Sequence, residues 1–161
     1  MNALDISIRP AQADDIAIIL GFIRQLADYE RLSHEVVADE ASIHEHLFGK
    51  DVVAGALLAE LNGVPRGFAL YFRSFSTFLG RPGIYLEDLF VDPEYRSRGI
   101  GRALLRSLAK LVVERGYGRL EWAVLDWNEP AIDFYARLGA EPLTGWTVNR
   151  VTGAALERLA E

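Results

Sequence analysis

The residues best suited to bind a charged ligand form a loop rich in arginine and glycine, Arg96 to Gly101, which reads R-x-x-G-x-G. An apolar run that predicts a strand precedes the loop, Asp92-Pro93 ends that strand, and an amphipathic helix follows. Successive backbone N–H groups in such a loop point at one spot, and the helix dipole adds partial positive charge there. Glycine, having no Cβ, lets a phosphate approach the main chain. The stretch therefore predicts a pyrophosphate site with arginines completing the charge.

Two common phosphate-binding motifs fit this loop less well. A dinucleotide-binding fingerprint would need Gly or Ala where Leu104 stands, and the chain lacks alternating βαβ units. A Walker-type loop is absent. A purely structural turn can contain two glycines, but it has no need of the three arginines Arg96, Arg98 and Arg102.

Two adjacent carboxylates, Glu87 and Asp88, lie in the apolar run YLEDLFV before the loop. Carboxylates are costly to bury without partners, so their presence there favours a functional role. An edge strand with solvated acids is the alternative. On a regular strand the two side chains point to opposite faces, so we expect only one of them to face a given site.

Three further candidates have ordinary structural roles on residue type alone. Tyr135 and its neighbour Phe134 are typical of aromatics that pack a short helix, and Asn128 is typical of a helix cap. His44 and His46 stand two residues apart on a predicted helix and face different directions, so we expect a solvated surface and no metal site.

The absence of cysteine excludes disulfides, thiolate zinc sites and a cysteine nucleophile.

The spacing of apolar residues predicts the elements that must position these groups. Strands are predicted over residues 4–9, 52–61, 67–73, 84–91, 120–125 and 146–151, with a loop over 80–83. Helices are predicted from Asp14-Asp15 towards Tyr29-Glu30, over residues 39–47, from the loop to a stop at Gly116, from Asn128 to Gly139, and over residues 154–160. This order predicts an α+β fold with a central mixed, largely antiparallel sheet flanked by helices. Asn62-Gly63 favours a tight hairpin turn between the second and third strands.

Composition limits the class of protein. Of 161 residues half are apolar, which predicts one domain over residues 1–161. The net charge of −6 argues against a nucleic-acid partner and favours cationic substrates by long-range steering. The basic patch from Arg96 to Arg106 has no stacking aromatic apart from Tyr95. The longest apolar run, 52–59, is too short to cross a bilayer, and the start has no signal-peptide core, so we expect a cytoplasmic protein without membrane contact.

Blocks of sequence along nearly the whole chain resemble a known family. After the loop come NEPA at 128–131 and FY at 134–135, a combination that resembles the GCN5-related N-acetyltransferase (GNAT) superfamily. YLEDLFV, YRSRGIG at 95–101 and WNEPAIDFYARLGA at 127–140 resemble its diamine (spermidine/spermine) N-acetyltransferases, as do IRPA at 8–11 and LADYE at 26–30. The resemblance implies the three-layer GNAT fold and acetyl-CoA-dependent acetylation of an amine.

The resemblance also implies where acetyl-CoA binds. Its pyrophosphate would lie on the loop and its pantetheine arm along the fourth strand. A backbone N–H of a splayed or bulged strand, at Leu89 or Phe90, would polarise the thioester carbonyl. Asn128 would contact the cofactor arm. The implied cofactor-binding residues are Leu89, Phe90, Val91, Arg96, Ser97, Arg98, Gly99, Ile100, Gly101, Arg102, Asn128, Pro130 and Ala131.

The same resemblance implies the catalytic groups. Tyr135 would act as the general acid that protonates the departing thiolate. Glu87 would act as the base, directly or through water, because an alkylammonium with a pKa of about 10.4 must lose a proton before it attacks. The implied substrate-binding residues are Tyr29, Glu30, Glu87, Glu121, Trp122 and Ala123. Without a cysteine for an acetyl-enzyme, direct attack by the amine is the simpler route.

The implied acceptor is a small cationic amine. Compared with polyamine-acetylating members, the segment before Gly145-Trp146 is shorter and has no acid next to Gly145, although Glu141 could substitute. Thialysine and other small primary amines therefore fit as well as polyamines. A homodimer is expected by resemblance, with the segment from Trp146 as a candidate contact. The alternatives are a protein lysine or N-terminal acetyltransferase and a non-catalytic acyl-CoA-binding sensor, and the presence of both Glu87 and Tyr135 argues against the sensor.

Overall fold

The computed structural model describes residues 5–161 and contains two compact units, Met1–Ala123 and Val124–Glu161. The first unit holds the sheet and the helices packed on it, and the second holds two short helices. The single domain over residues 1–161 stays a prediction. None of the helices in residues 5–161 is long and apolar enough to cross a membrane.

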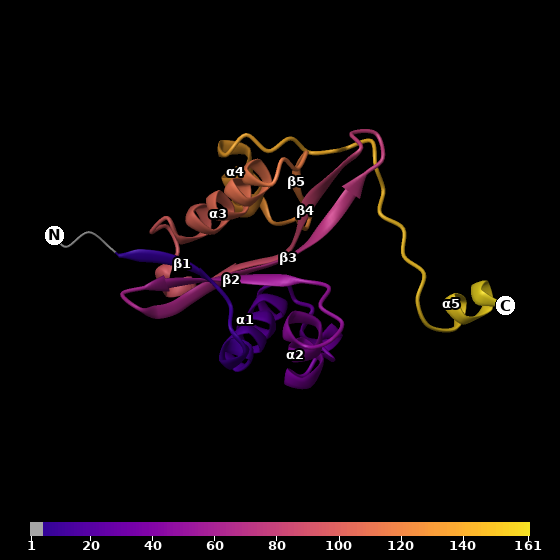
Figure 1. Ribbon diagram of the computed structural model, residues 1–161, viewed down its shortest axis with the longest axis horizontal. Helices are drawn as coiled ribbons and strands as arrows, with labels where there is room; N and C mark the ends of the chain where they lie inside the picture. The colour runs from indigo at the N-terminus through magenta and orange to yellow at the C-terminus, as the bar shows by residue number, and fades with distance from the viewer. Residues whose placement is uncertain (1–4) are drawn as a thin grey trace. The chain divides into compact units, whose positions relative to one another are not determined.

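The sheet of the first unit has the strand order β1-β2-β3-β4-β5 (Figure 1). Its strands are β1 (Ile6–Pro10), β2 (Gly55–Leu61), β3 (Val64–Ser76), β4 (Arg81–Val91) and β5 (Leu120–Trp122). The pairs from β1 to β4 are antiparallel, and β4 pairs with β5 in parallel. The prediction of a mixed, largely antiparallel sheet is thus confirmed. The turn between β2 and β3 is the predicted one, since Asn62 and Gly63 both have positive φ.

Three helices cover the two faces of this sheet. Figure 1 shows α1 (Ile16–Tyr29) and α2 (Glu40–Phe48) on one face and α3 (Ile100–Glu114) on the other, which confirms the three-layer fold. The core on the α1 side is formed by buried residues of both helices and three strands: Ile16, Ile19, Phe22, Leu47, Ala56, Leu58, Phe68 and Phe90. The ring of Phe22 contacts Phe68 and Phe90, with centroids 5.7 and 5.6 Å away, so the α1 face of the sheet includes the side chain of Phe90.

Several element boundaries differ from the prediction. β4 begins at Arg81, inside the predicted loop over 80–83, because it pairs with the extended end of β3 down to Ser76. β2 begins at Gly55, three residues late, and β3 runs from Val64 to Ser76, beyond both predicted ends. β5 ends at Trp122, because it pairs with only three residues of β4. Leu4, the predicted start of the first strand, lies outside the described residues.

The second unit contains α4 (Glu129–Arg137) and α5 (Gly153–Ala160), both predicted. The strand predicted over 146–151 is wrong, because these residues form neither strand nor helix. An extended segment needs a neighbouring strand to satisfy its N–H and C=O groups. No described strand pairs with it, and Trp146 and Val148 are 80 and 87% exposed.

Candidate active site

The pairing of β4 changes at Glu87. On one side Leu86 lies opposite Tyr71 and Asp88 opposite Leu70, so Glu87 is an extra residue that has no partner on β3. On the other side β4 pairs with β5 only over Ile84 to Leu86. A bulge bends its strand and increases its twist, so β4 and β5 separate at this point. The bulged strand that we expected to polarise a thioester carbonyl is present, and it starts two residues before Leu89.

Four carboxylates, on α1, β4 and β5, are connected through their effects on the pKa values of Asp88 and Tyr85. Burial raises the pKa of the half-buried Asp88 to about 6, and the negative charges of Glu87 and Glu30 add to this. Burial also raises the pKa of Tyr85, with further contributions from Glu87 and Glu121. Burial alone raises the pKa of Glu30. The interactions link α1, β4 and β5 into one acidic site, which we call the carboxylate cluster: Glu30, Glu87, Asp88 and Glu121.

Asp88 is a member of this cluster that was absent from the predicted site residues. On a regular strand its side chain and that of Glu87 would point to opposite faces, and we expected only one to face the site. A bulge places two consecutive residues of one strand opposite one residue of its neighbour and breaks this alternation. Asp88 and Phe90 are two residues apart on β4, so their side chains share a face, and Phe90 packs against α1. This spacing could have predicted that Asp88 faces α1, but no sequence pattern predicts the bulge.

The predicted substrate residues of the first unit lie around the same point. Tyr29 and Glu30 end α1. Glu121 lies opposite Tyr85 on β4, and its Oε1 forms an ion pair with Arg119 Nε, 3.2 Å away. Trp122 forms the last pair with β4, and Ala123 follows it as an exposed residue. The acidic site is therefore framed by the ends of α1 and β5.

The arginine and glycine loop has the backbone of an anion site. Ser97 and Gly99 both adopt left-handed conformations, with φ of 61 and 88°. Gly99 caps α3, whose first turn begins at Ile100. The first N–H groups of an α-helix have no intrahelical acceptor, and a turn that contains left-handed residues can orient neighbouring N–H groups into a concave anion site. The residues present therefore fit a pyrophosphate, and its binding there stays a prediction.

Arg96 connects the loop to α1. Its Nε donates a hydrogen bond to the carbonyl of Val91 at 3.0 Å. Its guanidinium carbon lies 4.9 Å from the ring centroid of Tyr29 and 5.8 Å from that of Phe90. Next to it is a cavity of about 480 Å³ between α1 and the end of β4, called here the α1–β4 cavity. Its lining residues are Arg24, Gln25, Asp28, Tyr29, Phe90, Pro93 and Arg96.

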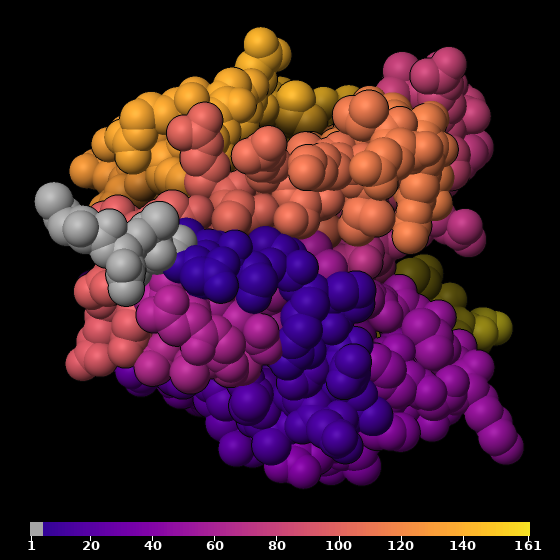
Figure 2. Space-filling model, turned by 60° about the vertical axis from the view of Figure 1, so that its left-hand side comes forward, coloured from indigo at the N-terminus to yellow at the C-terminus, as the bar shows by residue number. Residues whose placement is uncertain are grey.

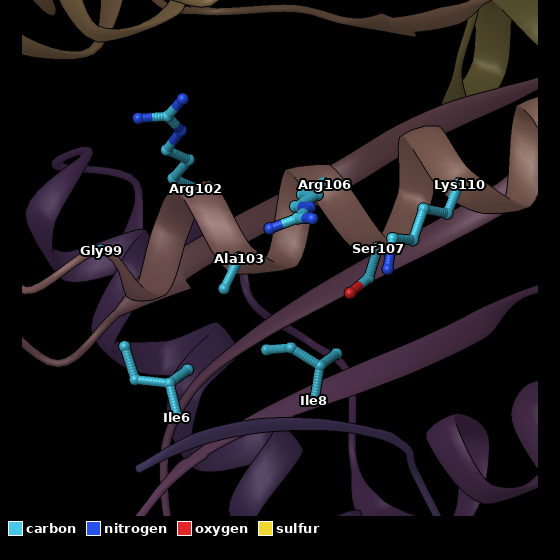
Figure 3. A pocket seen from close by; sticks show the side chains of 8 residues that line it. All are labelled: Ile6, Ile8, Gly99, Arg102, Ala103, Arg106, Ser107 and Lys110. Carbon is cyan, nitrogen blue, oxygen red and sulfur yellow. The ribbon is translucent and has the colours of Figure 1, made fainter. Parts of the chain in front are cut away.

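A second, basic cavity of about 390 Å³ lies between α3 and β1. Figure 3 shows Ile6 and Ile8 of β1 facing α3, which carries the exposed cations Arg102, Arg106 and Lys110. In Figure 2 the indigo residues of β1 lie at the surface beside the salmon residues of α3. None of the three cations forms an ion pair with a residue in 5–161. Positive charge therefore continues along α3 beyond the loop.

The remaining predicted site residues lie in the second unit. Asn128 is 8% exposed and caps α4, with its Oδ1 accepting a hydrogen bond from the N–H of Ala131 at 3.4 Å. Pro130 occupies the first turn. Tyr135 is half-buried, and its ring centroid lies 5.3 Å from that of Phe134. The capping role of Asn128 is confirmed, and its contact with a cofactor stays a prediction.

The raised pKa of Asp88 predicts a pH dependence of stability. The folded protein holds this proton more tightly than the unfolded chain, because the pKa rises from 3.8 to about 6 on folding. The free energy of unfolding therefore falls as the pH rises from about 4 to about 6, by about 3 kcal/mol at most. Asp88→Asn should remove that part of the dependence, as urea denaturation at a series of pH values would measure. An unchanged dependence in Asp88→Asn would contradict the burial of this charge.

Comparisons with known proteins bear on the family and the fold. The family model described as the acetyltransferase (GNAT) family matches residues 22–140. Thialysine N-epsilon-acetyltransferase of Bos taurus is 40% identical over 166 residues, covering 96% of this chain and 97% of that protein. L-ornithine N5-acetyltransferase NATA1 of Arabidopsis thaliana is 31% identical over 197 residues, covering 94 and 86%. An integron cassette protein from the mobile metagenome of V. cholerae has a similar fold, with a TM-score of 0.79 at 24% identity over 97% of this chain and 98% of that one.

Proposed function

The chain belongs to the acetyltransferase (GNAT) family, and on this premise we propose that it transfers the acetyl group of acetyl-CoA directly to a primary amine of a small cationic acceptor. Polyamines, thialysine and similar amines are the acceptor class. The relatives named for thialysine and ornithine support the smaller, amino-acid-like acceptors.

The observation that carries this proposal is the carboxylate cluster at the separation of β4 and β5. An enzyme that acetylates an amine must attract an ammonium, remove a proton from it and hold a thioester beside it. Asp88, Glu87, Glu30 and Glu121 supply negative charge at the bulge. The anion-binding loop follows at the end of the same strand, where β4 reaches Val91. The carboxylates that would attract the acceptor and the loop that would hold the donor thus lie on β4 or directly after it.

The chain's own residues would hold acetyl-CoA by its phosphates. N–H groups of the first turn of α3 and of the left-handed residues Ser97 and Gly99 would bind the pyrophosphate. Arg102 is exposed on that first turn and adds charge. When bound, acetyl-CoA supplies an activated acyl group with a thiolate as leaving group. A backbone N–H of Leu89 or Phe90, after the bulge, would donate to the carbonyl oxygen as negative charge develops.

Proton transfers then complete the reaction. Glu87, the exposed residue of the bulge, would accept the proton of the ammonium directly or through water. The amine nitrogen forms a bond to the carbonyl carbon, the carbon–sulfur bond breaks, and the nitrogen loses its second proton to water to give the neutral amide. Tyr135 would donate its phenolic proton to the thiolate, a role supported by its position in the family's FY block.

The experiment that tests the function follows thiol release from acetyl-CoA with a panel of spermidine, spermine, thialysine, ornithine, lysine and peptides. We expect turnover with small amines and little with peptides. Turnover restricted to peptides would replace the proposal with a protein acetyltransferase. Tight acetyl-CoA binding without turnover of any amine would replace it with a non-catalytic sensor.

The second unit supports a homodimer. Its C-terminal part exposes apolar side chains that a monomer leaves in water, as the exposed fractions show for Leu143 (64%), Trp146 (80%), Val148 (87%), Leu156 (52%) and Leu159 (74%). Apolar exposure of this extent is typical of protein contacts. We propose that the segment from Trp146 contributes to the subunit interface. Sedimentation of the full chain at the mass of one copy, 17.9 kDa, would rule this out.

A further inference from the structure

The α1–β4 cavity carries both signs of charge and two aromatic rings on its wall. Arg24 and Asp28 are four positions apart on α1 and therefore neighbours on one face of the helix. Arg96 comes from the loop after β4. The rings of Tyr29 and Phe90 complete the wall. None of these residues belongs to the carboxylate cluster, yet Tyr29 adjoins Glu30, and Phe90 is two residues from Asp88.

The charged groups of the cavity keep unused hydrogen-bonding capacity. Arg24 forms no ion pair with any residue in the described part of the chain. Arg96 is hydrogen-bonded through Nε, and this bond and the two rings beneath the guanidinium hold it in place. Its two terminal amino groups can therefore bind a carboxylate in bidentate fashion. Asp28 accepts a weak hydrogen bond from Ser33 Oγ on Oδ1, at 3.4 Å, which leaves Oδ2 open.

We propose that the α1–β4 cavity binds the zwitterionic end of a diamino-acid acceptor. Arg24 and Arg96 bind its carboxylate, Asp28 binds its α-ammonium, and Tyr29 and Phe90 contact its aliphatic chain. This inference rests on the proposed function and assigns the part of the acceptor that does not react. It makes these residues the determinants that favour an amino acid over a polyamine.

The length of a lysine side chain is close to the distance along β4 from the cavity to the carboxylate cluster. From Phe90 at the cavity to Asp88 in the carboxylate cluster is two residues of β4, or about 7 Å. The five bonds from the α-carbon of lysine to its terminal nitrogen span about 6 Å when extended, from single-bond lengths of about 1.5 Å. An acceptor whose amino-acid end lies in the cavity therefore places its reactive amine among the carboxylates.

The same cavity disfavours a polyamine. A diamine would carry a second ammonium into the space between two guanidinium groups, where only Asp28 offsets the repulsion. A like charge placed opposite another costs binding energy, and a site can select its ligand through such a penalty. Carboxylate binding by the two arginines and repulsion of the diamine thus act in the same direction.

The test compares acceptors that differ by one carboxylate: L-lysine with cadaverine and L-ornithine with putrescine. We expect kcat/KM to be about 10- to 100-fold higher for the amino acid of each pair, since charge-assisted hydrogen bonds are worth about 1.5–3 kcal/mol. Arg24→Gln and Arg96→Gln should each lower this ratio about tenfold. The ratio is taken within one preparation, so partial unfolding of a variant cancels. The KM for acetyl-CoA is measured alongside, because Arg96 is the first residue of the loop and one of the predicted cofactor-binding residues.

Two further variants sharpen the assignment. Asp28→Asn should reduce the preference for lysine over Nα-acetyl-lysine, which lacks the α-ammonium. Arg106→Gln removes another exposed arginine, one of α3 that does not line the cavity, and should leave every ratio unchanged. Equal turnover of lysine and cadaverine in the wild type, or ratios that do not respond to Arg24→Gln and Arg96→Gln, would overturn the inference while leaving the proposed function intact. Failure to acetylate any of the four amines would overturn the inference, and the proposed function falls with it only if spermidine, spermine and thialysine are not acetylated either.

Discussion

Tyr135→Phe is expected to lower kcat by about 10²- to 10⁴-fold, the usual contribution of a positioned general acid. The substitution keeps the ring that contacts Phe134 and removes only the hydroxyl. The departing thiolate then has to find its proton in water. Acetyl-CoA affinity should stay within a few-fold of the wild type, because no hydroxyl is needed to hold the phosphates.

Steady-state thiol release gives kcat, and calorimetric titration gives the acetyl-CoA affinity. Tyr117→Phe is the matched control, since it removes a phenol hydroxyl from a residue just beyond the end of α3 that is not among the predicted site residues. Equal losses of turnover and of acetyl-CoA affinity in Tyr135→Phe would indicate a packing role and would contradict the assignment of Tyr135 as the general acid.

Glu87→Gln is the second change with a large expected effect. At neutral pH it should lower kcat/KM for the amine about 100-fold, because the ammonium no longer has a base beside it. The loss should shrink about tenfold per pH unit as the pH rises, since more of an amine with a pKa of about 10.4 is deprotonated in solution. A pH profile of kcat/KM from pH 7 to 10 measures this recovery.

Asp88→Asn is the control that separates the two carboxylates of the bulge. Its pKa of about 6 suits a base at neutral pH, and its side chain senses both Glu87 and Glu30. If Asp88→Asn shows the loss and its recovery at high pH while Glu87→Gln does not, proton removal belongs to Asp88. If neither variant loses activity, the carboxylate cluster serves only to attract the amine.

Local patterns predicted most elements of the first unit. The three-to-four spacing of apolar residues along α1 and α3 and the alternation along β1 depend on near neighbours in the chain, so they can be recognised without a structure. The Asn62-Gly63 turn and the left-handed Gly99 are equally local, because both follow from the freedom of single residues at positive φ.

Non-local pairing accounts for the errors. β4 extends to Arg81 because the far end of β3 reaches it, and the segment 146–151 forms no strand because no described strand lies beside it. Residues can favour an extended backbone on their own, but they form a strand only where a neighbouring strand pairs with them. Trp146 and Val148 of this segment are exposed, which agrees with the lack of a neighbouring strand.

For the site, residue types and short spacings are enough to predict which chemical groups are available: a glycine loop for phosphates, a carboxylate pair on the central strand, and a tyrosine in a family block. Three other features come from the folded chain. The bulge at Glu87 breaks the alternation, Asp88 joins Glu30 in one cluster, and Arg96 lies over Tyr29 and Phe90. These facts depend on how α1 packs on β4, through contacts between residues about sixty positions apart that no local pattern records.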